Sequence, residues 1–71
     1  MKYWTYTTPE VARWVCCDMP HKAAELYLSG DGADPEKMHE VTVHLADDTK
    51  VLYTVHLASH TVREVVPCLP Q

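Results

Sequence analysis

The feature that most constrains the fold is the alternation of apolar and polar residues on both sides of an Asp-Asp-Thr segment at residues 47–49. The apolar residues that occupy every second position are Val41, Val43, Leu45, Val51, Tyr53 and Val55. A period of two residues is typical of a strand with one buried face. The sequence therefore predicts an antiparallel hairpin over residues 41–56, with one face packed and the other exposed to water.

The pairing of the two predicted strands follows from their faces. If Ala46 pairs with Lys50, all six alternating apolar residues lie on one face of the hairpin. This register places His44 opposite Leu52 and His56 opposite Glu40, on the polar face. By the same period of two, His39 lies on the face opposite to His44 and His56.

Residues 20–30 have the composition of a short helix. Pro20 suits the first turn, Gly30 suits the C-terminal end, and good helix formers lie between them. Ala23, Ala24, Tyr27 and Leu28 recur at helical spacing and predict a stripe that packs on the sheet. Residues 30–37 are rich in turn formers, and Asp34 with Pro35 is suited to starting one further helical turn.

The N-terminal region is open to two interpretations. Residues 2–7 are strand-like, and residues 14–17 contain weak helix formers, so we favour a second hairpin that turns at residues 8–10. In the alternative, Thr8 caps a helix that begins at Pro9. Residues 61–66 predict a last strand, which ends before Pro67.

These elements predict a single α+β domain over residues 1–71. Its core is one antiparallel sheet of four to five strands with one helix packed on one face. The favoured order is β-β-α-β-β-β, and the helical interpretation of the N-terminal region gives β-α-α-β-β-β. At 71 residues the chain has room for one small core only.

Composition excludes several classes of protein. The apolar share of 46% and the charged share of 23% are those of a globular domain and not of a disordered chain. No run of apolar residues is long enough to span a membrane. The N-terminus lacks the apolar segment of a signal peptide, and three cysteines make a poor disulfide framework, so we expect a cytoplasmic protein with reduced thiols.

The cysteines and histidines do not predict a metal site, a cofactor or an enzyme. The chain has no Cys-x-x-Cys motif, and the hairpin register keeps His44 and His56 too far apart for one coordination sphere. The best metal-ligating set that the spacing offers is Cys17, His21 and Cys68. A catalytic pair of Cys17 and His21 at the start of the helix is outweighed by a structural role, because adjacent cysteines in a strand face opposite sides as small hydrophobes.

Charge carries the main functional signal. Residues 18–48 contain eight acids and two lysines, a net charge of −6, whereas the remainder of the chain carries +2. If the helix end, the following loop and the hairpin turn lie at the same end of the sheet, their acids form one acidic edge. The candidate partner-binding residues of that edge are Asp31, Asp34, Glu36, Glu40, Asp47 and Asp48. A solvated surface that only keeps the protein soluble is the structural alternative.

Direct nucleic-acid binding is not predicted, since only six lysines and arginines are scattered over a chain of net charge −4. Tyr3, Trp4, Tyr6 and Trp14 are the residue types that stack on bases. Without flanking basic residues they are more typical of a core or of an exposed protein-binding patch.

The segment Arg13-Trp14-Val15-Cys16-Cys17-Asp18, the helix that starts at Pro20 and the hairpin with Asp47-Asp48 together resemble small accessory proteins of phages and mobile elements. Some anti-CRISPR proteins belong to this group. The resemblance covers residues 3–57 and includes no diagnostic motif, so it assigns no residue a role. It implies a compact acidic inhibitor that occupies a nucleic-acid or partner site on a host complex.

The sequence therefore predicts a non-enzymatic acidic binding protein, an inhibitor of the phage or mobile-element type. Its partner would be a larger host protein or ribonucleoprotein with a basic surface, and its acids would pair with the Lys and Arg side chains that normally hold phosphates. Two alternatives stay open. One is a homodimeric structural or regulatory module that uses Trp4, Tyr6 or the water-exposed sheet face with Leu52. The other is a metal or redox sensor that uses the cysteines and histidines.

Overall fold

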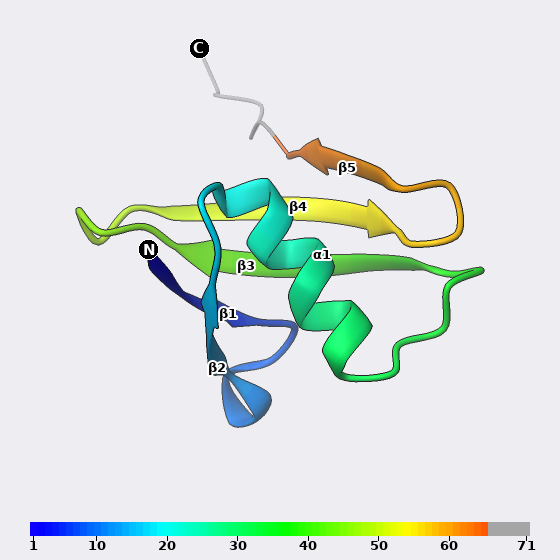
Figure 1. Ribbon diagram of the computed structural model, residues 1–71, viewed down its shortest axis with the longest axis horizontal. Coiled ribbons are helices and arrows are strands. Elements are labelled where there is room, and N and C mark those ends of the chain that lie inside the picture. The colour runs from blue at the N-terminus through cyan, green and yellow to red at the C-terminus, as the bar shows by residue number, and fades with distance from the viewer. Residues whose placement is uncertain (66–71) are drawn as a thin grey trace, which may run out of the picture.

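The computed structural model describes residues 1–65 and shows one helix packed on one face of a five-stranded antiparallel sheet (Figure 1). The strands lie side by side in the order β2-β1-β3-β4-β5. The elements in chain order are β1 (Lys2–Tyr6), the short 3-10 helix η1 (Pro9–Val11), β2 (Arg13–Cys16), α1 (Pro20–Gly30), β3 (Met38–His44), β4 (Lys50–His56) and β5 (Thr61–Glu64). The predicted α+β class and the favoured order of elements are confirmed.

Of the two interpretations of the N-terminal region, the hairpin is correct. β1 and β2 pair antiparallel, with Trp4 opposite Trp14 and Lys2 opposite Cys16. The helical alternative is wrong over residues 13–16, where β-branched and aromatic side chains fit a pleated strand better than a helix. What the Thr8-Pro9 signal produces is a single 3-10 turn, closed by a hydrogen bond from the Val11 N–H to the Thr8 carbonyl at 3.1 Å.

The helix has the predicted bounds and buries the predicted stripe. Ala23, Ala24, Tyr27 and Leu28 are its buried residues. The two alanines allow the helix backbone to approach the sheet closely, and Tyr27 and Leu28 contribute the large apolar surfaces. The Asp31 N–H closes the C-terminal end by hydrogen bonds to the carbonyls of the last turn.

One face of the sheet supplies the other half of the core. Its buried side chains are Tyr3, Thr5, Val41, Val43, Tyr53 and Val55. Thr5, the one buried polar side chain among residues 1–65, donates a hydrogen bond to the Tyr3 carbonyl at 3.2 Å, so its burial leaves its hydroxyl with a partner. The residues that alternate with this set point to the opposite face.

The central hairpin has the predicted faces but not the predicted register. His44 pairs with Lys50, Thr42 with Leu52, and Met38 with His56. The three-residue loop is Ala46-Asp47-Asp48, closed by the Leu45 N–H on the Thr49 carbonyl at 2.8 Å. Its third residue, Asp48, has φ 68°. The predicted register would have put the β-branched Thr49 in that left-handed position, which is sterically costly, whereas Asp tolerates it.

The remaining predicted segments are confirmed in part. β5 spans Thr61–Glu64, and Val66 at the end of the predicted strand lies outside the described residues. The segment after the helix forms a turn and no further helix: the Asp34 carboxylate accepts a hydrogen bond from the Glu36 N–H at 2.9 Å. Among residues 1–65, no helix has the length and apolarity to cross a membrane.

Because the backbone at Asp48 is left-handed, the stability of the fold should depend on the shape of the side chain at this position. We expect Asp48→Val to lower the free energy of unfolding by about 1–2 kcal/mol, because a β-branched residue clashes with its own backbone there. Asp48→Asn, which also tolerates positive φ, is the matched control and leaves stability nearly unchanged. Chemical denaturation measures both; equal stability of the two variants would contradict the turn geometry.

The same turn predicts an acid-sensitive contact. Hydrogen bonds from the Thr49 side chain and backbone lower the pKa of the Asp47 carboxyl below its ordinary value. Because the pKa of Asp47 is lower in the folded chain than in the unfolded chain, the ionised carboxylate stabilises the fold at pH values above its unfolded-state pKa. This stabilisation is lost as the pH falls through the folded-state pKa. An NMR titration should find the Asp47 pKa lowered, and Thr49→Ala should raise it again. An unchanged pKa in Thr49→Ala would contradict the assignment.

Candidate functional site

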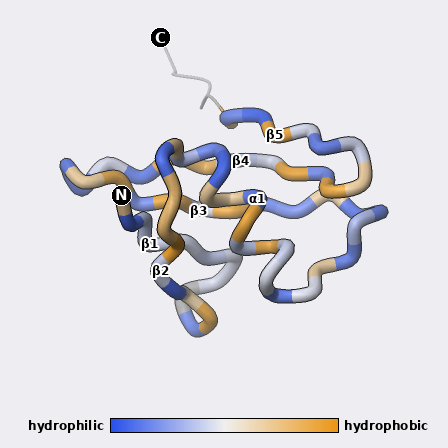
Figure 2. The backbone as a smooth tube through the Cα atoms, viewed as in Figure 1, coloured by the Kyte–Doolittle hydropathy of each residue, from blue (hydrophilic) through white to orange (hydrophobic). Residues whose placement is uncertain are grey.

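The six acids predicted to bind a partner do not form one edge. Asp31, Asp34 and Glu36 lie at and after the end of α1, near the start of β3, whereas Asp47 and Asp48 lie in the turn after its end. The seven residues of β3 separate the two groups by roughly 20 Å at the rise of a strand. Figure 1 shows the two loops at opposite tips of the long axis, and both tips are hydrophilic in Figure 2. Glu40 lies between them on β3.

Several of these acids are engaged within the chain. Asp31 caps α1 and lies 4.0 Å from the Arg13 guanidinium. Asp34 accepts the Glu36 N–H, and Asp47 accepts the Thr49 N–H at 3.1 Å. These contacts give Asp31, Asp34 and Asp47 structural roles in a helix cap and two turns. The condition for a single acidic edge, that the helix end, the following loop and the hairpin turn lie at the same end of the sheet, is therefore not met.

The open face of the sheet is the surface on which uncommon side chains gather. Within the described part of the chain, α1 is the one α-helix, and it covers the other face. The side chains of the open face come from all five strands: Lys2, Trp4, Tyr6, Trp14, Cys16, Met38, Glu40, Thr42, His44, Lys50, Leu52, Thr54, His56, Thr61 and Arg63. It combines aromatic rings with bases, which distinguishes it from an ordinary polar sheet face.

Two tryptophans form an aromatic pair on this face. Trp4 and Trp14 are cross-strand partners on β1 and β2, with ring centroids 5.2 Å apart and planes tilted by 58°. The hydrogen bond from the Cys17 N–H to the Met1 carbonyl fixes the alternation of the ladder, so this pair occupies a non-hydrogen-bonded site. At such a site the Cα atoms approach most closely, which brings the rings together. Trp14 is 62% exposed despite its size.

Tyr6 and His44 continue the aromatic surface onto β3. The Tyr6 hydroxyl lies 3.0 Å from His44 Nε2, at hydrogen-bonding distance, and the ring centroids are 5.4 Å apart. His44 pairs with Trp4 on one side and with Lys50 on the other. The imidazole is therefore held between an indole and an ammonium group, with its orientation fixed by Tyr6.

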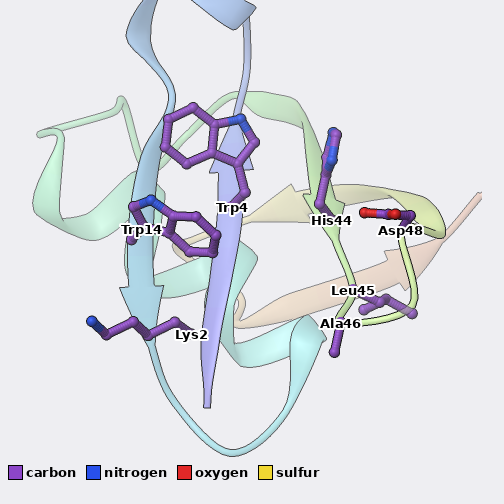
Figure 3. Close-up of a pocket in the computed structure, with 7 residues that line it drawn as sticks. All are labelled: Lys2, Trp4, Trp14, His44, Leu45, Ala46 and Asp48. Atoms are coloured by element: carbon purple, nitrogen blue, oxygen red, sulfur yellow. The ribbon is translucent and has the colours of Figure 1, made fainter.

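These residues surround a hollow of about 520 Å³ at the end of β3 (Figure 3). The indoles of Trp4 and Trp14 form one side, and His44 with Asp48 forms the other. Lys2, Leu45 and Ala46 complete the lining. The hollow presents apolar walls with two oppositely charged groups at its rim, an arrangement that suits an apolar side chain with polar neighbours.

Charge is divided between the open face and the rest of the surface. On the open face three bases, Lys2, Lys50 and Arg63, are opposed by Glu40 and by Asp48 at the rim of the hollow. Elsewhere three bases are opposed by eight acids; Asp47, for example, lines a hollow with Tyr3 and Pro20 on the helix side. Bases therefore outnumber acids on the open face, whereas acids outnumber bases over the rest of the described surface taken together.

The histidines and cysteines lie apart. His39 faces the helix side, as predicted, and its Nε2–H donates to the Asp34 carbonyl at 2.8 Å. Cys16 is exposed on the open face, whereas Cys17 packs against the core and donates to the Met19 carbonyl at 3.0 Å, so the adjacent thiols face opposite sides as predicted. Among residues 1–65, no three such side chains gather as metal ligands; Cys68 of the predicted set lies outside the described residues.

A second cluster lies at the opposite end of the open face. The Nε2–H of His56 donates to the Glu36 carbonyl at 3.3 Å, so Nδ1 accepts from the Ser59 hydroxyl at 2.7 Å. Ser59 also lies 2.8 Å from the Thr61 hydroxyl. These bonds join the β4–β5 loop to the segment before β3. They organise a turn in which His60 has φ 55°.

Comparisons of this chain with protein-family models, with curated proteins and with solved structures found no match. The candidate site therefore stands on the geometry alone. Sequence reasoning named Trp4, Tyr6 and Trp14 as core or as a protein-binding patch. Trp14 is exposed on the open face, beside the half-buried Trp4. The residue pattern alone does not give the register of β1 and β2, and it is this register that makes the two indoles neighbours.

The indole pair predicts a spectroscopic signature and a small energetic effect. Two indoles at this distance and tilt should give an exciton couplet in the far-ultraviolet circular dichroism, which Trp4→Phe or Trp14→Phe abolishes. We expect Trp14→Ala to cost about 1 kcal/mol or less of stability, as is typical of an exposed cross-strand aromatic pair. A couplet that survives in both variants would contradict the pairing of Trp4 with Trp14.

Proposed function

We propose that this protein is a non-enzymatic binding protein whose working surface is the open face of the sheet, centred on the hollow beside Trp4 and Trp14. The partner is a protein surface that presents an apolar side chain with carboxylates around it. The apolar side chain fills the hollow, and the carboxylates meet Lys2, Lys50 and Arg63. The observation that carries the proposal is the exposure of Trp14, packed against the half-buried Trp4, on a sheet face that carries three bases and two acids.

An exposed aromatic surface of this kind is costly to leave in water. Trp14 is 62% exposed, although tryptophan and tyrosine are the residues that contribute most to binding when they are buried at an interface. Trp4 and Trp14 lie on paired strands, and His44 is held by Tyr6. The surface is therefore rigid before binding, and docking orders few side chains.

Charge selects the class of partner. The bases of the open face attract an acidic surface, and this attraction accelerates encounter in a salt-dependent manner. The net charge of −4 of the whole chain opposes binding to nucleic acid, whose phosphates need many more bases than the three on this face. This proposal reverses the sign of the partner predicted from the sequence, because the acids are dispersed and the exposed aromatic residues lie among bases.

The role of an inhibitor of the phage or mobile-element type stays a prediction from the resemblance alone. A docking surface on a rigid sheet is compatible with that role, since occupation of a partner's site needs no chemistry. The acids on the helix side and at the two tips provide the solubility that an exposed aromatic patch requires.

The test is capture of binding partners by matched variants of the tagged protein. We expect Trp14→Ala to weaken retention of a specific protein by about 2 kcal/mol or more, roughly thirtyfold in affinity. Leu26→Ala is the matched control: Leu26 is 50% exposed on α1, on the far side of the molecule, and its loss should leave retention unchanged. Asp47→Lys with Asp48→Lys tests the acidic interpretation in the same experiment.

The outcomes separate the hypotheses. A partner lost by Trp14→Ala and kept by Leu26→Ala supports the proposal. A partner lost by the acid reversals and kept by Trp14→Ala would overturn it in favour of an acidic contact surface, and failure of every form to retain a protein would also contradict it. Because both tryptophans of the chain line the hollow, saturable quenching of their fluorescence by oligothymidylate would indicate nucleic-acid binding instead.

A further inference from the structure

The two edges of the sheet differ in how they are protected. β5 carries Arg63 and Glu64 within its four residues, and charged side chains are a common device that discourages pairing with another chain. β2 has one charged residue, Arg13, and its guanidinium is turned back onto the helix. There it donates to the Tyr27 carbonyl and lies 4.8 Å over the Tyr27 ring. The outer edge of β2 therefore consists of the uncharged residues Trp14, Val15 and Cys16.

The ladder between β1 and β2 shows which backbone groups point outward. The Cys17 N–H bonds to the Met1 carbonyl, and with the observed register this places Val15 and Arg13 at hydrogen-bonded sites that face β1. The N–H and C=O groups of Trp14 and Cys16 point away from β1, since bonding and non-bonding residues alternate in an antiparallel pair. In the described part of the chain, no backbone partner is present for them.

From this edge we propose that two copies of the chain associate by antiparallel pairing of β2 with β2. A two-fold axis at Val15 brings Trp14 of one copy opposite Cys16 of the other, and the four outward groups of each copy then find partners in its twin. Such an interface is isologous, because the same patch serves both subunits. The result is a continuous ten-stranded sheet with a single open face that carries two hollows.

The charges near this edge do not oppose a second copy. With the axis at Val15, Arg13 of one copy lies opposite Cys17 of the other, and its guanidinium stays turned back onto its own helix. The Asp18 carboxylate lies 3.8 Å from Lys22 of its own chain. The paired edge itself, at Trp14, Val15 and Cys16, carries no charge that would repel an identical strand.

This association does not use the side chains that the docking proposal needs. Pairing of edges runs through the backbone in the plane of the sheet, whereas the indoles stand on the open face. The two proposals are therefore independent. Loss of association would leave the Trp4 and Trp14 hollow in place, and loss of the indole of Trp14 would leave the outward backbone groups intact.

The first test is the mass in solution, measured by sedimentation equilibrium under reducing conditions up to millimolar concentration. We expect the wild type to approach twice 8.1 kDa as concentration rises. Cys16→Pro removes an outward N–H without touching the bonds to β1, and it should hold the protein at the monomer mass. Cys16→Ser, the matched control, keeps that N–H and should associate like the wild type. A monomer at every concentration, or association of Cys16→Pro equal to that of the wild type, would overturn the proposal.

The second test uses the wild type alone and so does not depend on whether a variant folds. Amide hydrogen exchange at Trp14 and Cys16 should slow as concentration rises, because pairing protects the outward N–H groups. The amide of Val15, which already bonds within the sheet, serves as the internal reference and should change little. Exchange at Trp14 and Cys16 that stays fast at the concentration of the dimer would show that another surface holds the copies together, and would contradict the proposal.

Discussion

The structure depends on one packing constraint: an eleven-residue helix has to cover a five-stranded sheet, and it can cover only one face. Ala23 and Ala24 bring the helix backbone close to the strands, and Tyr27 then joins three elements. Its hydroxyl donates to the Val11 carbonyl at 3.0 Å, and its own carbonyl accepts from Arg13. The helix, the 3-10 turn and β2 are held through this one residue, which explains why the N-terminal hairpin stays on the sheet.

The same constraint produces the functional surface. Because no second helix lies on the other face in the described part of the chain, that face has to be compatible with water. Tryptophan, tyrosine and histidine meet this requirement in part, since each joins an apolar ring to a polar atom. The tilt of Trp4 against Trp14 and the contact of Tyr6 with His44 give the face a fixed shape. Rigidity, amphipathic rings and a local excess of bases are the properties on which the docking proposal depends.

Local periodicity predicted the helix and the strands well. The strand register and the grouping of surface charges depend on contacts between distant residues, and these were not predictable from local patterns. The helix bounds and its four buried residues follow from spacing alone, as do the faces of the central hairpin. The register of that hairpin depends on which residue takes the left-handed position. Asp48 does so, whereas the predicted pairing of Ala46 with Lys50 would have placed Thr49 there. The grouping of the acids failed for a related reason: the strand β3 runs between Asp34 and Asp47, so proximity along the chain does not carry over to the surface.

The central claim is that one face of the sheet is covered and the other is open, and a soluble paramagnetic probe tests it directly by NMR. The account predicts strong relaxation enhancement for side chains of the open face, with Trp14, Lys50 and Arg63 as the clearest reporters. It predicts protection for Thr5, Val43 and Val55, which are fully buried on the covered face. Equal protection of both sets at low protein concentration would contradict the account, because it would mean that the indole face is buried within the chain.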